Sequence, residues 1–329
     1  MNSKNKKPFS KDIIKIEDIE TAVNQLAQKL KEDIYLKCKR KGAVIGISGG
    51  IDSSVCLALV VKALGPEKVF GIMMPEKDSS PDSLELADKL AKVFGVETIV
   101  ENISSALEGF RCYERRDEAV KRVFPEYDPS IHKMKIGIKE SGLYSNLPPL
   151  FYITIIDQAG NEKTERLPAN EFRTIMAASD FKQRSRMSIL YYHAERLHYA
   201  VVGTPNKHEE NQGFFVKYGD GGADVMPIAH LYKTQVYQLA DYLNIPQEII
   251  DRTPTTDTYP AEQTQEEFFF QLPFKQMDLL WYAYENKYNL KEVADVVGKS
   301  VDEVEKIFSN FKRKQSTTEY LRMAPIKYF

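Results

Sequence analysis

The sequence contains little cysteine, tryptophan or histidine and no long apolar run. Its 329 residues include 3 cysteines, 1 tryptophan and 5 histidines. Cys38, Cys56 and Cys112 form no CxxC pair, which excludes a paired-thiol redox motif or a cysteine metal cluster and predicts reduced thiols. No stretch offers the roughly 18 consecutive apolar residues of a membrane-spanning helix, and the polar, Lys-rich residues 1–11 lack the apolar core of a signal peptide. We therefore expect a cytoplasmic protein with no membrane partner.

The sequence also lacks an excess of charge of either sign. Its 45 basic and 47 acidic residues leave a net charge of -2 and a pI near 6.3, which gives no general attraction to nucleic acid or to anionic membranes. Two common nucleotide-binding loops are missing, because neither GxxxxGK[ST] nor GxGxxG occurs. The hydrophobic content of 43% is nevertheless enough for a substantial core. This balance favours a globular enzyme without a nucleic-acid partner.

One stretch carries most of the functional signal, the run VIGISGGIDSS that begins at Val44. An apolar strand stops in the turn Ser48–Gly50 and restarts as a helix. Two adjacent glycines let backbone N–H groups close on an anion, and the helix offers its positive N-terminal end to the same anion. The hydroxyl of Ser53 adds a donor, and Asp52 is placed to hold a divalent cation that bridges to phosphate. The stretch predicts a magnesium-pyrophosphate site, although an ordinary strand-to-helix turn with N-cap serines has a similar pattern.

Helical and strand patterns alternate on both sides of this loop. Such alternation predicts an α/β fold, a doubly wound Rossmann-like parallel sheet with helices on both faces and ligands at the carboxyl ends of the strands. Apolar residues at helical spacing precede the first strand, and further alternating segments follow it. The predicted strands are 44–47, 69–74, 97–100 and 199–202, and the predicted helices are 13–39, 55–64, 82–94, 185–197 and 231–243.

The alternation breaks between residues 111 and 167. Two β-like runs flank the turn DQAGN at 157–161, which predicts an inserted β-hairpin. The insert is expected to serve as a substrate lid or an oligomer contact, or else to be a surface ornament. His132, Lys133 and Lys135 could meet an anionic substrate there, although a short basic cluster is more typical of a solvated loop.

A second group of polar residues follows the predicted strand at 199–202. It consists of GTPNKHE at 203–209 and the glycine-rich GFFVKYGDGGAD at 213–224. Glu209 can supply a second carboxylate for the cation held by Asp52, since Mg²⁺ usually takes one or two carboxylates together with phosphate oxygens and water. Lys233 can neutralise charge on the transferring phosphoryl group, although a lone helical lysine is more often solvated.

The motifs together resemble those of ammonia-dependent NAD synthetases, members of the N-type ATP pyrophosphatases. They are SGGxDS, the KxRxRM-like run at 182–187, GTxNxxE, GFFxKYGDGGAD and LYKTQV at 231–236, which stand in that family's order and spacing from about 43 to 257, apart from the insert. The resemblance implies an ATP- and magnesium-dependent ligase. Such an enzyme adenylates the carboxylate of deamido-NAD and transfers ammonia, which gives NAD, AMP and pyrophosphate.

The resemblance also assigns roles to single positions. Asp52 and Glu209 would hold magnesium, and Asp52, Lys233 and Thr255 would be catalytic. The dinucleotide substrate would be held by Arg184, Lys217 and Asp224. The implied ATP contacts are Gly46, Ser48, Gly49, Gly50, Asp52, Ser53, Thr204, Lys233 and Thr255.

Several positions depart from the family pattern in the region expected to recognise the acceptor. Tyr320-Leu321 stand where the family has a His-Lys pair, and Asp180 stands in place of an Asn. These departures leave open the same chemistry on another carboxylate, and a catalytically silent nucleotide-binding module is a third alternative. We expect a helical segment at 1–40, an ATP pyrophosphatase domain at 41–257 and a C-terminal helical segment at 258–329. A homodimer is expected, with ammonia taken up free or from a separate glutaminase.

Overall fold

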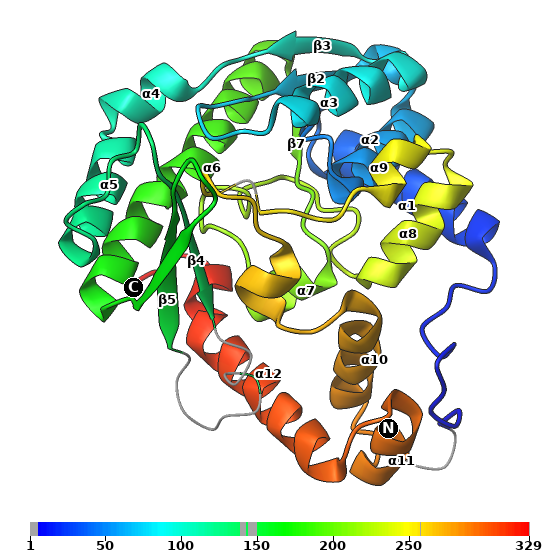
Figure 1. Ribbon diagram of the computed structural model, residues 1–329. Helices are drawn as coiled ribbons and strands as arrows, with labels where there is room; N and C mark the ends of the chain where they lie inside the picture. The colour runs from blue at the N-terminus through cyan, green and yellow to red at the C-terminus, as the bar shows by residue number, and fades with distance from the viewer. Residues whose placement is uncertain (1–5, 139–142, 144–149, 257, 329) are drawn as a thin grey trace.

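The structure is a computed structural model that describes residues 6–138, 143, 150–256 and 258–328. Its central sheet has four parallel strands in the order β3-β2-β1-β7 (Figure 1). The strands are β1 (Ala43–Gly46), β2 (Val69–Met73), β3 (Glu97–Val100) and β7 (Ala200–Val202). The chain adds β2 and β3 on one side of β1 and β7 on the other, so the direction of winding reverses between β1 and β7. Ligands of open parallel sheets bind at such a reversal, beyond the carboxyl ends of the strands.

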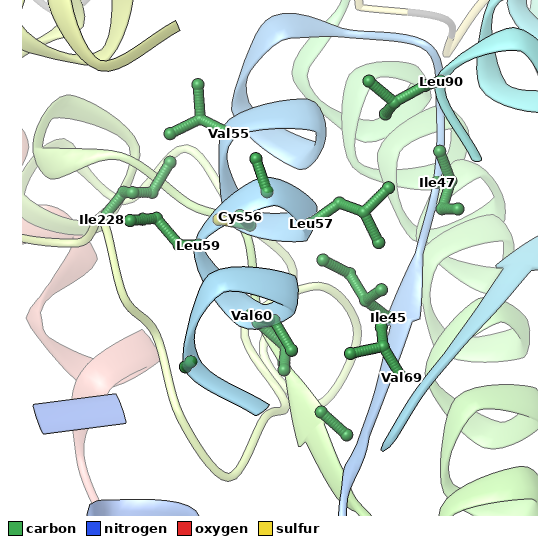
Figure 2. Close-up of a cluster of buried hydrophobic side chains, with 14 of the residues drawn as sticks. Ile45, Ile47, Val55, Cys56, Leu57, Leu59, Val60, Val69, Leu90 and Ile228 are labelled. Atoms are coloured by element: carbon green, nitrogen blue, oxygen red, sulfur yellow. The ribbon is translucent and has the colours of Figure 1, made fainter. Parts of the chain in front are cut away.

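Helices cover both faces of this sheet, which confirms the predicted fold class. Successive residues of a strand point to opposite faces. Ile45 accordingly packs with the buried side chains of α2, whereas Val44 packs with those of α6. Figure 2 shows the first of these cores, in which Leu57 and Val60 of α2 lie near Ile45. The helices concerned are α1 (Ile19–Glu32), α2 (Ile51–Leu64), α3 (Pro81–Phe94), α6 (Ala169–Leu197), α8 (Lys233–Tyr242) and α9 (Gln247–Asp251).

Several helices differ in length from the predicted ones. The first begins at Ile19 rather than at residue 13, because Asp18 accepts a hydrogen bond from the N–H of Thr21 at 3.0 Å and caps it. It continues after Glu32 as a π-helix, Asp33–Lys37. The sixth helix begins at Ala169, well before the predicted residue 185. A short 3₁₀ helix, Pro66–Lys68, precedes β2.

The insert between β3 and α6 is larger than the predicted hairpin. The hairpin is present as β5 (Phe151–Ile156) and β6 (Glu162–Arg166), but β4 (Lys133–Ile138) pairs antiparallel with β5 and makes a sheet of three strands. Residues 133–138 therefore form a strand and not the predicted basic loop, because Met134 and Ile136 alternate with the two lysines and are buried. Two helices, α4 (Ser104–Gly109) and α5 (Cys112–Val123), precede this sheet.

The C-terminal part forms a second hydrophobic core around Trp281, which packs on Phe311 with ring centroids 4.7 Å apart. The N-terminal residues 6–18 join this core, since Phe9 and Ile14 are buried in it. Among the described residues, no helix is long and apolar enough to cross a membrane. The elements of this part are a π-helix, η4 (Glu266–Phe270), and the helices α10 (Phe274–Glu285), α11 (Leu290–Val297) and α12 (Val301–Arg322), while α7 (Lys207–Gln212) precedes α8.

Candidate active site

The loop that follows β1 forms a backbone cradle at the start of α2. Ile47 still pairs with β2 and donates its N–H to the carbonyl of Ile72 at 2.9 Å, after which the chain turns through Ser48–Gly50. Gly49 has a φ of +73°, and a Cβ there would lie 2.6 Å from the carbonyl oxygen of Ser83, so the turn requires glycine. No side chain of the described residues caps α2. Its first N–H groups and its dipole are therefore available to an anion.

Asp52, Glu209 and Lys233 come together from three helices at the carboxyl edge of the sheet. Asp52 lies in the first turn of α2, Glu209 in α7, and Lys233 is the first residue of α8. The ammonium of Lys233 donates to Oδ2 of Asp52, and Nδ2 of Asn206 donates to Oδ1 of the same carboxylate at 3.3 Å. Nε2 of Gln265 donates to Oε1 of Glu209 at 3.3 Å. Hydrogen bonds thus hold both acids within one cluster.

This cluster places two acids beside one lysine where little solvent reaches them. Lys233 is fully buried and Glu209 is 9% exposed. Burial raises the pKa of Glu209 to about 8, with a further rise from the charge of Asp52 and an opposing effect of Lys233. Burial lowers the pKa of Lys233, but the charges of Asp52 and Glu209 outweigh it, so the pKa lies above the ordinary value. A cation beside Glu209 would remove the cost of its buried charge.

The two carboxylates fit a magnesium ion whose ligands come partly from the protein and partly from a nucleotide. Two carboxylates are the usual protein contribution to such a site, with phosphate oxygens and water completing the shell. The described part of the chain holds no cluster of three or more His, Cys, Asp or Glu that would form an all-protein site. Asp52 and Glu209 are therefore the residues that would hold the ion.

Glu209 owes its position to the cap of α7. The side chain of Asn206 accepts from the N–H of Glu209 at 3.3 Å, and Oε2 of Glu209 accepts from the N–H of Asn206 at 2.9 Å. These reciprocal bonds form a capping box, which stabilises the first turn of a short helix. The same Asn206 bonds Asp52, so one amide side chain organises both acids.

The cradle and both acids line a cavity of about 470 Å³. Its lining includes most of the positions predicted to contact ATP. It also includes aromatic rings from the insert, α6, the loop after α7 and the C-terminal part. The polar lining includes Gly46, Ser48, Gly50, Asp52, Ser53, Thr204, Glu209 and Thr255, and the aromatic lining includes Phe151, Phe172, Phe214, Phe215, Phe268 and Phe269.

The three positions predicted to hold the dinucleotide lie elsewhere, since none is among the described residues that line this cavity. Arg184 forms an ion pair with Asp180 at 3.6 Å. Lys217 donates to the carbonyls of Tyr320 and Met323 at 2.8 and 2.9 Å. Asp224 accepts from the N–H of Val201 at 2.8 Å. From the KxRxRM-like run, Lys182, Gln183, Arg186 and Met187 line the cavity instead.

A buried cluster of charged residues borders the cavity. The sequence motifs did not predict it. The ammonium of Lys182 donates to Oε1 of Glu76 at 2.9 Å, to Oδ2 of Asp78 at 2.8 Å and to the carbonyl of Thr258 at 2.8 Å. Arg116 of α5 contacts the same oxygen of Asp78. The signal for Lys182 was present in the motif, but its acidic partners lie more than a hundred positions away in sequence and carry no motif of their own. Asn206 and Gln265 were also missed, although Asn206 is the Asn of the GTxNxxE motif and both bond acids that were predicted.

The sheet order and the cradle together place the molecule among α/β proteins that bind a nucleotide where the winding reverses. The chain belongs to the NAD synthase family, whose pattern it matches over residues 19–125 and 151–322. It is 45% identical over 318 residues to the NH(3)-dependent NAD(+) synthetase of Rhizobium rhizogenes, which covers 97% of this chain and 95% of that one.

Solved structures share the fold. The NH3-dependent NAD synthetase of Campylobacter jejuni has a TM-score of 0.63 at 22% identity and covers 95% of this chain and 100% of that one. An NMN synthetase from Francisella tularensis has a TM-score of 0.59 at 22% identity and covers 93% of this chain and 98% of that one. At this identity the two structures inform the fold, and the sequence relatives carry the family.

Proposed function

We propose that this chain is an ammonia-dependent NAD(+) synthetase. It adenylates the carboxylate of deamido-NAD with ATP and transfers ammonia to give NAD, AMP and pyrophosphate. The observation that carries the proposal is the 45% identity to the Rhizobium rhizogenes enzyme over 97% of the chain, and the phosphate cradle beside two acids and a lysine supports it.

The chemistry requires positioning and charge neutralisation more than a nucleophilic side chain. A carboxylate oxygen of the acceptor attacks the α-phosphorus of ATP, and the bond to the bridging oxygen breaks as pyrophosphate leaves. Ammonia then attacks the acyl carbon, the bond to the adenylate oxygen breaks, and AMP leaves while the added nitrogen loses a proton. The N–H groups of Ser48–Gly50 and the N-terminal end of α2 would stabilise the departing charge.

Asp52 and Lys233 would act at the phosphates, together with Thr255 and the other ATP contacts implied by the motifs. Lys233 would neutralise charge on the phosphoryl group. A magnesium ion held by Asp52 and Glu209 would supply Lewis-acid neutralisation of the pyrophosphate oxygens. Arg184, Lys217 and Asp224 would hold the dinucleotide outside the cavity that receives ATP.

The wider properties follow the same proposal. We propose a homodimer in the cytoplasm that takes up ammonia free or from a separate glutaminase. The division into a helical segment at 1–40, an ATP pyrophosphatase domain at 41–257 and a C-terminal helical segment at 258–329 remains our proposal; residue 257 itself lies outside the described residues. The C-terminal segment would complete the substrate site through Lys217, which donates to the carbonyls of Tyr320 and Met323.

A second candidate is the same chemistry on another carboxylate. It is favoured by Tyr320-Leu321, which replace the His-Lys pair of the family pattern and adjoin Lys217. Tyr320 is 61% exposed and lies with its ring 5.8 Å from the ammonium of Lys217. An acceptor that needs no further cation would suit this arrangement.

The test is an assay of the full chain with ATP, Mg²⁺ and ammonium chloride. Deamido-NAD, nicotinate mononucleotide and nicotinate are compared as acceptors, and NAD, AMP and pyrophosphate are quantified. Deamido-NAD is expected to react best. Amidation of another acid without turnover of deamido-NAD would select the second candidate, and absence of ATP cleavage with every acceptor would favour a silent module.

Site variants extend the assay. Asp52→Ala and Glu209→Ala are each expected to lower kcat by at least about 100-fold, because each removes charge at the phosphates. Asp302→Ala is the matched control, since that carboxylate is 82% exposed on α12 and forms an ion pair with Lys306. Unchanged turnover in a folded Asp52→Ala or Glu209→Ala variant would contradict the proposed site.

A further inference from the structure

A carboxylate of α10 connects the two helices that carry Glu209 and Lys233. Asp278 is fully buried, as is His208. Oδ1 of Asp278 lies 2.5 Å from Nε2 of His208, and Oδ2 accepts from the backbone N–H of Thr234 at 2.8 Å. One side chain of the second hydrophobic core thus holds α7 with one oxygen and α8 with the other.

The two partners of Asp278 adjoin the proposed site residues in sequence. His208 directly precedes Glu209, and Thr234 directly follows Lys233. Nδ1 of His208 lies 3.3 Å from the side-chain nitrogen of Gln212, so Nδ1 accepts and Nε2 carries the hydrogen that Asp278 receives. This pattern fixes the orientation of the imidazole and with it the backbone next to Glu209.

A second carboxylate of α10 repeats the arrangement two turns further along. Glu285 accepts from Lys207, the first residue of α7, at 2.9 Å and from the hydroxyl of Tyr232 at 2.9 Å. Tyr232 immediately precedes α8. Residues at positions i and i+7 lie on the same face of a helix, so this face of α10 grips the beginnings of α7 and α8 at two points. The ring of Phe274, also in α10, lies 5.2 Å from the ammonium of Lys233.

We propose that Asp278 is a positioning residue that sets the places of Glu209 and Lys233 near Asp52, with Glu285 as its secondary support. The inference rests on the proposed function and adds to it a role for the C-terminal helices. Through Asp278, α10 determines where the carboxylate of Glu209 lies at the cavity and where the ammonium of Lys233 meets Asp52, although α10 supplies none of the described residues that line the cavity.

The alternative is a purely structural role, in which Asp278 only completes the hydrogen bonding of a buried helix junction. Both roles predict a loss of stability on substitution, since the buried donors of His208 and Thr234 would lose an acceptor. Only the positioning role predicts a change in the folded protein's response to nucleotide. The two are therefore separated by binding and kinetics measured well below the unfolding temperature.

Asp278→Asn is the decisive variant. A carboxylate has two acceptor oxygens, whereas an amide has one, so asparagine can serve either Thr234 or His208 but not both. We expect kcat to fall about 10- to 100-fold, as for other residues that orient a ligand from behind it, with the KM for deamido-NAD changed less than about twofold. Glu285→Gln should lower kcat less, because that side chain is 29% exposed.

Binding of α,β-methylene-ATP, which cannot be cleaved between its α and β phosphates, gives a second readout by isothermal titration calorimetry. Wild-type protein should bind it more tightly with Mg²⁺ than without. The magnesium-dependent gain is the ratio of the two dissociation constants, and it should be about tenfold or more smaller in Asp278→Asn. This measurement needs no acceptor. A wild-type chain that makes no NAD but shows the magnesium-dependent gain would therefore overturn the proposed function and leave the positioning role standing.

Leu280→Ala is the matched control. Leu280 is a fully buried neighbour in α10, so the substitution destabilises the same helix and keeps both carboxylate contacts. Its kcat per folded molecule and its magnesium-dependent gain should equal those of wild type. Equal values for Asp278→Asn would overturn the proposal. If Asp278→Asn does not fold, Glu285→Gln is the deciding variant. A wild-type kcat and a wild-type magnesium-dependent gain in affinity in Glu285→Gln would equally overturn the proposal.

Discussion

Lys314 is a lysine whose charge is poorly tolerated where it lies. It projects from α12 onto η4, where its ammonium donates to the carbonyl of Phe269 at 2.8 Å and to Oε1 of Gln212 at 3.3 Å, without an acidic partner in those contacts. Burial lowers its pKa to about 7, and the charge of Arg313 adds to the effect. The folded protein releases this proton near pH 7, whereas an unfolded lysine keeps it to about pH 10.4. The unfolded state binds more protons between these values, so folding stability rises with pH across that window.

Replacement by methionine removes the cost of this charge and keeps the length of the side chain. Lys314→Met should therefore be more stable than wild type at pH 6, where the cost is present in full, and the difference should shrink as pH rises through 7 to 9. Urea unfolding at several pH values measures this. Lys312→Met, at an exposed position of the same helix, serves as control. A stability difference for Lys314→Met that stays constant from pH 6 to pH 9 would contradict the lowered pKa.

At the residue scale, the sequence predicts the site best where a strand ends. The prediction that Asp52 and Glu209 meet follows from the rule that ligands gather beyond the carboxyl ends of parallel strands, and the structure brings both acids to one cavity. Asp278 could not be found in this way, because it lies on a helix 70 positions from its partner His208. A contact between two helices that are distant in sequence leaves no local pattern from which it could be predicted.

At the scale of elements, the buried charge cluster explains how the insert is joined to the rest of the molecule. Arg116 belongs to α5, Lys182 to α6, and both meet Asp78 in the loop after β2. Lys182 also holds the carbonyl of Thr258. Burial raises the pKa of Asp78, but the two cations outweigh it and bring the pKa below the ordinary value. The cluster thus joins α5, α6, the loop after β2 and the segment at Thr258 beside the cavity. Each buried charge in it is stabilised by an opposite charge.

Lys182→Met should lower the free energy of unfolding by about 3–5 kcal/mol, because it leaves the buried carboxylate of Glu76 without its cationic partner. The double variant Lys182→Met/Glu76→Gln should recover part of this loss, since it also removes that unpaired charge. Urea unfolding at pH 7 compares the two with Lys89→Met, whose exposed pair with Glu248 contributes at most about 1 kcal/mol. A double variant less stable than Lys182→Met would show that charge balance does not govern the cluster.

Helix and strand prediction succeeds here where the apolar period is regular and fails where tertiary contacts decide. The predicted ends of the helices at Leu64 and at Phe94 agree with the structure. The first half of α6, from Ala169, was missed because its apolar residues face both the insert and the cavity, which blurs a single apolar stripe. In β4 the alternation was present, but the intervening lysines suggested a solvated loop.

At the scale of the whole molecule, the N-terminal arm of residues 6–18 joins the two hydrophobic cores. Phe9 is buried in the C-terminal core, and its N–H donates to Glu292 of α11 at 2.7 Å. The carbonyl of Ile14 accepts from Gln235 of α8 at 2.7 Å. Figure 1 shows this arm running from α1 toward α11. The arm therefore links α8, which packs on the sheet, to α11 of the C-terminal part.

Phe9→Ala should cost about 3–5 kcal/mol of stability, as for other buried phenylalanines, and the loss should be concentrated in the C-terminal helices. Hydrogen exchange followed by mass spectrometry should show faster exchange in α10–α12 than in β1 and α2, because local opening follows the element that loses its packing. Leu36→Ala is the control, since Leu36 is 71% exposed. Because α10 supports Glu209 and Lys233, looser C-terminal helices should also lower turnover. Uniformly faster exchange over the whole chain would mean instead that the two cores unfold as one unit and that the arm only adds to their common stability.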